Sequence, residues 1–429
     1  MTHSDRTVPS TIQIDASAHC QLACPCCPTA SGETRKAMSA GHLDPAKLER
    51  LLDANPQVAD VELSNYGEMF LNPKLAEILR IAFERRVVLH ADNGTNLNHA
   101  PAEILEALVR YRFRSLTVSI DGASPEAYSR YRIKGDFERV IGNIEKLNSL
   151  KRKHLSGFPI LTWQFIVFGH NQHEIEAAKG RAAKLGMRFK PKLSWDDDFS
   201  PIQDGKLVQI QAGLPASRKQ FHQATGTEYM RPICYQLWFS PVLNWDGRLM
   251  GCCRNFWGEF GGNAFEDGLA ASLSASRIPS ARRALMGKEA MDPQSPCTDC
   301  EQYLSMQHSG KWISQGELDR AEKDRSGVAV GMVVDPRDSP ATHVDLFVGP
   351  GHEVNRMLLA RPPAAQRFEI GTSYSAYVKL GPGKYTIYAL PKQLDPSFRR
   401  HYPALPPATL AIEVSERPIA QEFVVRLTP

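Results

Sequence analysis

The sequence has no long apolar run and no marked excess of charge of one sign. No stretch approaches the roughly 18 apolar residues that a membrane-spanning helix needs, so no membrane partner is expected. Lysine and arginine number 51 against 47 aspartates and glutamates, which gives a net charge of +4. Without a basic block, no nucleic-acid partner is expected either. The polar start MTHSDRTVPS lacks the apolar core of a signal peptide, which favours a cytoplasmic location.

Internal repeats and low-complexity tracts are also absent, so the organisation must be sought in changes of pattern along the 429 residues. Within residues 1–205, short apolar runs alternate with amphipathic segments. Strands are expected at 11–16, 58–64, 87–91, 115–121, 160–168 and 187–194. Asp44, Asn72 and Ser124 each precede a proline suited to the first turn of a helix. This alternation predicts an α/β fold, a partial (β/α)6 barrel whose site lies at the carboxyl ends of its strands.

Three further segments follow the predicted barrel. Residues 206–312 hold five cysteines and a hairpin expected to turn at Trp245–Gly247. Residues 313–328 are polar and charged, as in a linker or solvated helix. Residues 329–429 contain short alternating strands and no cysteine, which predicts an all-β sandwich of unknown role. It could bind a substrate carrier, a glycan or a partner protein, or shield the mouth of the barrel.

Nine cysteines are present, and four of them lie in the segment HCQLACPCCP. In a reducing compartment such clusters indicate metal ligands rather than disulfides. Cys20, Cys24 and Cys27 have the spacing C-x-x-x-C-x-x-C, and three thiolates on one loop would hold three irons of a [4Fe–4S] cube and leave the fourth open. His19 would complete a Cys₃His zinc site as an alternative. Cys26 is either a small buried residue, a fourth ligand or a redox-active thiol.

This motif directly after a first strand resembles that of the radical S-adenosylmethionine (radical SAM) superfamily. The resemblance implies a [4Fe–4S] cluster whose open iron binds S-adenosyl-L-methionine. It further implies reductive cleavage to a 5′-deoxyadenosyl radical, which takes a hydrogen atom from the substrate, and a reductant such as flavodoxin or ferredoxin. Cys26 occupies a position that is usually aromatic in the family.

Two turns after the expected second and third strands also resemble the family. In NYGEMFLNP, Gly67 and Glu68 match its G-E-P element, with Met69 in place of the proline. The resemblance implies that this element presents polar groups to the amino nitrogen of the cofactor. Asn93, in DNGTNL, matches the T-N-G segment that shapes the floor of the pocket.

The fourth and fifth strands carry the remaining cofactor-binding candidates. The resemblance implies that Ser119 and Asp121 face the ribose. It also implies that Arg132 pairs with the methionine carboxylate, although a solvated helix charge is the alternative. Asn171 and Glu174, in FIVFGHNQHEIEAA, either reach the adenine side or cap a helix.

The second group of cysteines has the spacing C-x(12)-G-x(4)-C followed by CTDC, and its expected ligands are Cys234, Cys252, Cys297 and Cys300. The pattern resembles the SPASM extension of radical SAM enzymes, in its shortened twitch form. It implies a second, auxiliary [4Fe–4S] cluster that either relays electrons or only staples the hairpin to the barrel. A Cys₄ zinc site is the alternative.

Three residues are candidates for catalysis. Cys253 is either a hydrogen-atom donor, as an epimerase would need, or a buried hairpin cysteine, and the sequence leaves open whether it or Cys252 is the ligand. Asp196 and Asp197 follow the expected sixth strand. They are either the general base of a dehydrogenase or part of a solvated loop.

Three functions compete. The first is a radical SAM enzyme that oxidises or epimerises a small polar molecule such as a sugar or alcohol. The second is a peptide-modifying radical SAM enzyme. It is less favoured because the first strand, expected near residue 11, leaves no room within this sequence for an N-terminal peptide-binding domain. The third is a non-catalytic iron–sulfur or zinc scaffold.

Overall fold

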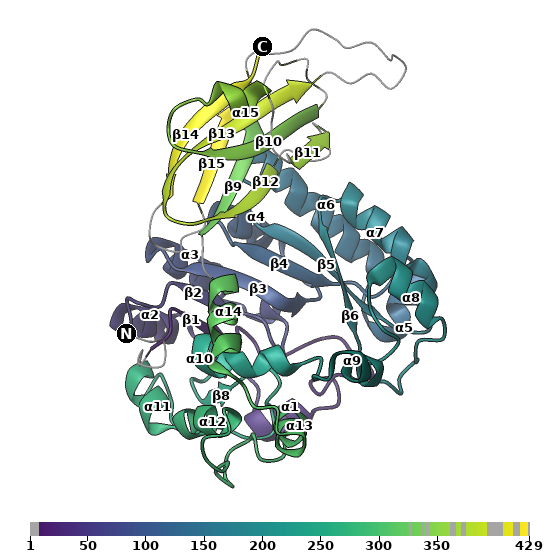
Figure 1. Cartoon of the computed structure of the whole chain (residues 1–429), viewed down its shortest axis with the longest axis vertical. Coiled ribbons are helices and arrows are strands. Elements are labelled where there is room, and N and C mark those ends of the chain that lie inside the picture. The colour runs from purple at the N-terminus through teal and green to yellow at the C-terminus, as the bar shows by residue number, and fades with distance from the viewer. Residues whose placement is uncertain are drawn as a thin grey trace.

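The structure, a computed structural model, describes residues 8–325, 328–335, 339, 341, 343–360, 366–369, 375–392, 406–414 and 421–427. It has a large α/β part and a smaller all-β part at one end (Figure 1). This is the fold class that the sequence predicts.

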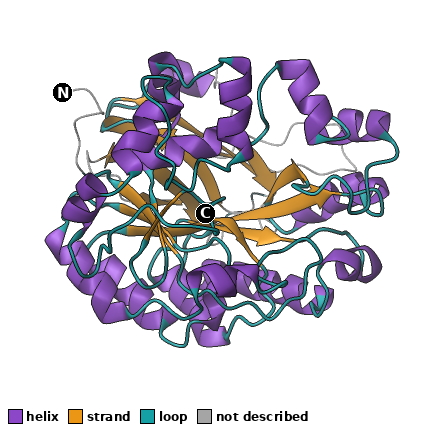
Figure 2. Ribbon diagram, turned by 90° about the horizontal axis from the view of Figure 1, so that it is seen from below, coloured by secondary structure: helices purple, strands orange, loops and turns teal. Residues whose placement is uncertain are grey.

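One eight-stranded sheet forms the centre of the α/β part, in the order β6-β5-β4-β3-β2-β1-β7-β8. Its first six strands are parallel neighbours and lie where the sequence predicts them: β1 (Thr11–Ile14), β2 (Asp60–Glu62), β3 (Val88–Thr95), β4 (Ser115–Ser119), β5 (Ile160–Val167) and β6 (Arg188–Leu193). The order runs from β6 to β8 without closing, so the barrel is partial. Helices surround the strands when the molecule is seen from the end opposite the all-β part (Figure 2).

The helices between these strands bury one apolar face against the sheet. They are α1 (Glu33–Met38), α2 (Pro45–Ala54), α3 (Leu75–Glu84), α4 (Ala102–Arg110), α5 (Pro125–Tyr131), α6 (Phe137–Lys153) and α7 (Ile175–Lys184). Asp44 caps α2 and Ser124 caps α5, as predicted. Asn72 is not the N-cap of α3, which begins at Leu75, but its Oδ1 accepts from the Lys74 amide at 2.8 Å just before the helix. Its Nδ2 donates to the carbonyls of Ala16 and Leu43, at 2.8 and 3.0 Å.

The predicted hairpin consists of β7 (Val242–Leu243) and β8 (Leu249–Gly251), and its turn places Gly247 at φ 97°. Its position in the sheet was not predicted, since β7 pairs in parallel with β1 and thereby extends the barrel. Further helices follow β6 along the chain: α8 (Gly205–Ala212), which packs against α7, then α9 (Arg218–Thr225), α10 (Gln236–Phe239), α11 (Leu269–Ala275), α12 (Ile278–Leu285) and α13 (Glu301–Ser309).

The polar segment after α13 forms helix α14 (Gln315–Arg325). Glu317 binds the buried Arg231 guanidinium at 2.9 Å, and Arg325 donates to the Ser240 hydroxyl at 3.0 Å. These contacts hold α14 against the α/β part, so it is not a free linker.

Two sheets form the all-β part, in the orders β11-β10-β13-β14 and β12-β9-β15. The strands are β9 (Val328–Asp335), β10 (His343–Pro350), β11 (Gln366–Glu369), β12 (Ser375–Leu380), β13 (Gly383–Lys392), β14 (Ala408–Val414) and β15 (Gln421–Arg426), with helix α15 (Arg356–Ala360) after β10. Apolar residues of both sheets form one core, as in a sandwich.

The sandwich docks at the amino-terminal side of β5. A Glu422 carboxylate oxygen accepts hydrogen bonds from the Ser156 hydroxyl at 2.9 Å and the Gly157 amide at 2.6 Å. This end of the barrel is opposite the carboxyl ends of the strands. The sandwich therefore does not shield the barrel mouth, which was one of the roles considered for it.

No helix among the described residues combines the length and the apolar character needed to cross a bilayer.

Candidate active site

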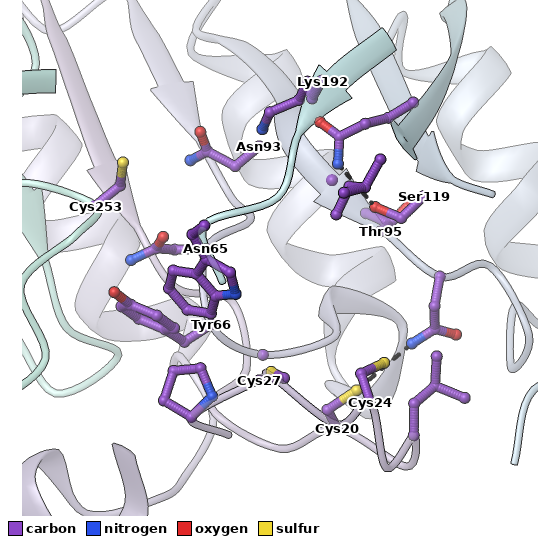
Figure 3. A pocket seen from close by; sticks show the side chains of 18 of the residues that line it. Cys20, Cys24, Cys27, Asn65, Tyr66, Asn93, Thr95, Ser119, Lys192 and Cys253 are labelled. Carbon is purple, nitrogen blue, oxygen red and sulfur yellow. Dashed lines mark hydrogen bonds between the residues drawn. The ribbon is translucent and has the colours of Figure 1, made fainter. Parts of the chain in front are cut away.

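A cavity of about 250 Å³ lies at the carboxyl ends of the parallel strands. The loop after β1 contributes Cys20, Cys24 and Cys27, and the other walls come from the ends of β2, β3, β4 and β6 and from the hairpin. Figure 3 shows the three cysteines together on one side, with Asn93, Lys192 and Cys253 away from them. The cavity occupies the place where parallel α/β folds bind ligands.

All three cysteines of the first loop carry free thiols and line this cavity. Asn96 Nδ2 donates to Cys20 Sγ, and Arg132 Nη1 donates to Cys24 Sγ, both at 3.7 Å. Donors of this kind stabilise thiolates and tune the potential of an iron–sulfur cluster. Apolar residues such as Leu22 and Phe168 pack around the loop. Three accessible sulfurs, two donors to sulfur and an apolar surround fit a [4Fe–4S] cluster with one open iron.

Cys26 packs with these cysteines but does not line the cavity. Its thiol interacts with Asp196, and burial followed by that interaction raises its pKa to about 12. Cys26 is thus placed apart from the position of a fourth ligand.

The turn at Gly67 and Glu68 locks the cysteine loop onto the barrel. The Glu68 amide donates to the His19 carbonyl at 2.7 Å, and a Cβ on Gly67 would lie 1.6 Å from the Ser17 carbonyl oxygen. Only glycine permits this approach. Burial raises the pKa of the Glu68 carboxyl to about 7, although that carboxyl accepts hydrogen bonds from the amides of Asn96 at 2.6 Å and Phe70 at 3.3 Å.

Asn93 and Ser119 line the cavity as expected from the sequence. Asn93 Nδ2 donates to the Ser64 carbonyl at 2.7 Å, and Ser119 Oγ accepts from Gln164 Nε2 at 3.2 Å. Both side chains are therefore held in fixed orientations at the cavity wall.

Arg132 lines the cavity, but two of its expected companions lie behind the wall. Asp121 is 0% exposed and accepts from Arg132 Nε at 2.6 Å, so it orients this arginine rather than facing a ribose. Asn171 is also 0% exposed, and its side chain joins the Phe168 amide to the Asp121 carbonyl. Glu174 accepts from Ala123 and Ser124 at the start of α5 and is likewise structural.

The second group of cysteines comes together from three loops. Burial has the largest effect on the pKa of the Cys252 thiol and raises it. The charges of four other thiols raise it further, in decreasing order Cys253, Cys297, Cys234 and Cys300. The thiols of Cys234 and Cys297 are perturbed in the same way, by burial and then by Cys300. The structure thus places Cys252 among the other three, whereas Cys253 lines the cavity.

Comparison with known proteins identifies the α/β part. Residues 15–179 match the family model described as the radical SAM superfamily. These residues belong to that superfamily. Its members use a [4Fe–4S] cluster and S-adenosylmethionine, so both are cofactors of the domain that contains residues 15–179.

One curated relative, the AdoMet-dependent heme synthase of Methanosarcina barkeri, is 33% identical over 143 residues. The match covers 32% of this chain and 39% of the relative, so the chain spans well under half of that protein.

Two solved structures of SuiB from Streptococcus suis share the radical SAM fold. The structure bound to S-adenosylmethionine aligns over 69% of this chain and 72% of that chain, at 15% identity and a TM-score of 0.50. The structure bound to the precursor peptide SuiA aligns over 71% of this chain and 72% of that chain, at 14% identity and the same TM-score of 0.50.

The two candidate bases do not reach the cavity. Asp196 and Asp197 line an outer groove of about 710 Å³. Asp196 Oδ1 accepts from the amides of Asp198 at 2.9 Å and Phe199 at 3.1 Å, and these bonds lower the pKa of its carboxyl. The structure thus supports the loop interpretation for both aspartates.

Sequence reasoning missed several cavity residues, notably Asn65, Tyr66, Gln164, Lys192 and Arg218. Lys192 carried a usable signal, because alternation along a barrel strand places every second residue on the inner face. Arg218 begins a short helix that follows α8 after residues 213–217, and no local pattern links it to the cavity.

Proposed function

We propose that this radical SAM enzyme is an epimerase of a small polar substrate, in which Cys253 donates a hydrogen atom to the substrate. The observation that carries the proposal is the position of Cys253. Its side chain lines the same cavity as Cys20, Cys24 and Cys27 but lies apart from them (Figure 3). Hydrogen removal from one face and hydrogen delivery from the other invert a carbon atom.

In this proposal Cys20, Cys24 and Cys27 hold the cluster, and Cys234, Cys252, Cys297 and Cys300 hold a second one. S-adenosylmethionine, when bound in the cavity, supplies the radical that removes a hydrogen atom from the substrate. Arg132, held by Asp121, presents its cation to the methionine carboxylate. Asn93 and Ser119 offer polar atoms at the wall of the cavity.

Cys253 is well placed for its role because its backbone is fixed. Its backbone amide donates to Gln236 Oε1 at 2.7 Å. The preceding residue, Cys252, belongs to the second cysteine group. Delivery of a hydrogen atom breaks the S–H bond and leaves a sulfur radical. One electron and one proton must restore the thiol, and a reductant of the flavodoxin or ferredoxin type would supply the electron.

Oxidation of an alcohol is the second candidate, favoured by Lys192. Burial lowers the pKa of this lysine to about 8, so its neutral amine is accessible near neutral pH. After a hydrogen atom has been removed from the carbon, such an amine would take the proton of the hydroxyl, and the second cluster would accept the remaining electron to give the carbonyl.

Peptide modification is favoured by the outer groove. The groove shares Trp195, Arg218 and Met230 with the cavity, so a longer substrate would have a continuous path to the cysteines.

The test uses the full chain reconstituted anaerobically with iron and sulfide, reduced, and supplied with S-adenosylmethionine in heavy water. Sugars, aminocyclitols and short peptides are offered as substrates. Wild-type protein should release 5′-deoxyadenosine and place one deuterium on an inverted carbon. Cys253→Ala should still release 5′-deoxyadenosine but incorporate no deuterium, whereas the matched Asp196→Asn variant should behave as wild type. Retained inversion in Cys253→Ala, or a two-electron-oxidised product, would contradict the proposal.

A further inference from the structure

The cavity contains more cationic than anionic side chains. Arg132, Lys192, Arg218 and Arg254 line it, and Glu68 is the one carboxylate among its lining residues that the structure describes. Both oxygens of Glu68 already accept backbone hydrogen bonds. The positive charge of this cavity is therefore not balanced from within.

Two of these cations have partners elsewhere. Arg132 pairs with Asp121 at 2.6 Å. Arg254 Nη2 binds Glu301 at 2.7 Å, and its charge acts on Cys234 in the second cysteine group. Neither cation requires a ligand to explain it.

Lys192 makes no hydrogen bond or ion pair with any described residue. It lies at the end of β6, where its ammonium group points into the cavity (Figure 3). Desolvation, then the charge of Lys190, lower its pKa to about 8. Cys253 and Asp121 act in the opposite direction, and Arg218 adds to the lowering. Leaving this cation half-buried and unpaired costs free energy that an anion would recover.

Arg218 is the second unpaired cation. It lies at the start of α9, its guanidinium stacks over Tyr229 at 5.2 Å, and its Nε is buried without a hydrogen-bond partner. Desolvation and the charge of Arg254 lower its pKa to about 10, whereas Tyr229, Asp197 and Glu301 act in the opposite direction. The stacking fixes the plane of the guanidinium, and no described residue satisfies its Nε.

Lys192 and Arg218 are not needed to balance the negative charge of the ligand thiolates. The charges that act most strongly on Cys20 and Cys24 come from Glu68, Arg132 and neighbouring thiols. Those acting on Cys234 and Cys252 come from other cysteines, Arg231 and Arg254. Lys192 acts instead on Cys253, which belongs to neither cysteine group, and Arg218 acts on Lys192.

We propose that Lys192 and Arg218 form an anion subsite that holds an acidic group of the substrate, a carboxylate or a phosphate. The subsite deepens the proposed function and rests on it, because it identifies the chemical class of the substrate that Cys253 faces. An anion between the two cations relieves their repulsion and makes charge-assisted hydrogen bonds to both. A substrate held there by its acidic group would present a neighbouring carbon to the cavity.

The test is competitive acetylation of the reconstituted, anaerobic full chain with limiting acetic anhydride, with labelling at each lysine read by mass spectrometry. The probes are succinate, its neutral analogue succinamide and inorganic phosphate, at equal ionic strength and with S-adenosylmethionine present. Lys179, exposed on α7, is the internal control. This readout is independent of turnover, so it can fail while the epimerase proposal stands, and the reverse also holds.

Succinate or phosphate should slow acetylation of Lys192 about tenfold without affecting Lys179, and the more protective anion identifies the acidic group. Succinamide should give no protection. In Arg218→Gln the anion concentration for half-protection should rise about tenfold, and Arg218→Lys should restore part of it. The proposal is overturned if neither anion protects Lys192, or if S-adenosylmethionine alone already protects it fully.

Discussion

Substitution of Gly67 by alanine tests whether the turn after β2 holds the first cysteine loop in place. The new Cβ would lie 1.6 Å from the Ser17 carbonyl oxygen and 2.9 Å from the Ala18 Cα, both of them backbone atoms that cannot rotate away. The two backbones must separate, which also weakens the 2.7 Å hydrogen bond from Glu68 to His19. Overpacking costs about 1–3 kcal/mol and the lost hydrogen bond about 1 kcal/mol, so the free energy of unfolding should fall by about 2–4 kcal/mol.

Two measurements on anaerobically reconstituted protein check this expectation. Urea unfolding should show the loss of stability, and iron content should fall from about eight to about four per chain, since each cluster holds four irons. The matched control is Gly142→Ala in the interior of α6, where a Cβ meets no atom within 4 Å, so stability should rise by about 0.5–1 kcal/mol. If Gly67→Ala unfolds like wild type and keeps all its iron, the turn does not hold the loop.

Three other substitutions probe charges away from the cavity. Burial raises the pKa of Asp15 to about 7, so the folded state keeps a proton that the unfolded chain releases near pH 3.8. The free energy of unfolding should therefore fall by about 1.4 kcal/mol per pH unit as the pH rises between those two values. Asp15→Asn should remove that slope in urea titrations from pH 4 to 8, and an unchanged slope would refute the assignment. Glu317→Gln leaves the buried Arg231 without its carboxylate and should lower stability by about 1–3 kcal/mol in the same assay; no loss would show that the pair contributes nothing. Glu422→Gln should loosen the sandwich, measured as faster hydrogen exchange at Gly157, without changing iron content; unchanged exchange would argue against this docking contact.

Local sequence patterns were sufficient to predict the elements of the barrel. Apolar runs of strand length located β1 to β6, and acceptor–proline pairs located the starts of α2 and α5, because these features depend on neighbouring residues. The first cysteine motif was predictable for the same reason, since all three sulfurs lie on one loop.

Long-range pairing could not be predicted in this way. The contact between β7 and β1 joins Gln13 to Val242, and no local signal specifies such a partner. The contact of α14 with the α/β part through Glu317 was also not predictable, because the sequence of α14 is as polar as that of a solvated helix.

Burial of polar groups was the other source of error in the site. The side chains of Asp121 and Asn171 do not line the cavity, because they accept from the backbone amides of Ile166 in β5 and of Phe168 just after it. Lys192 shows the reverse case, a charged residue of an ordinary strand that faces the cavity. Side-chain direction at a strand end depends on backbone geometry that the sequence pattern does not contain.

The most direct measurement compares two adjacent cysteines, Cys26 and Cys27. Cys27 lines the cavity with Cys20 and Cys24, whereas Cys26 lies outside it beside Asp196. Release of 5′-deoxyadenosine from S-adenosylmethionine is followed in anaerobically reconstituted, reduced protein. Cys26→Ala should release it at the wild-type rate, and Cys27→Ala should release none. Loss of activity in Cys26→Ala together with full activity in Cys27→Ala would contradict the account.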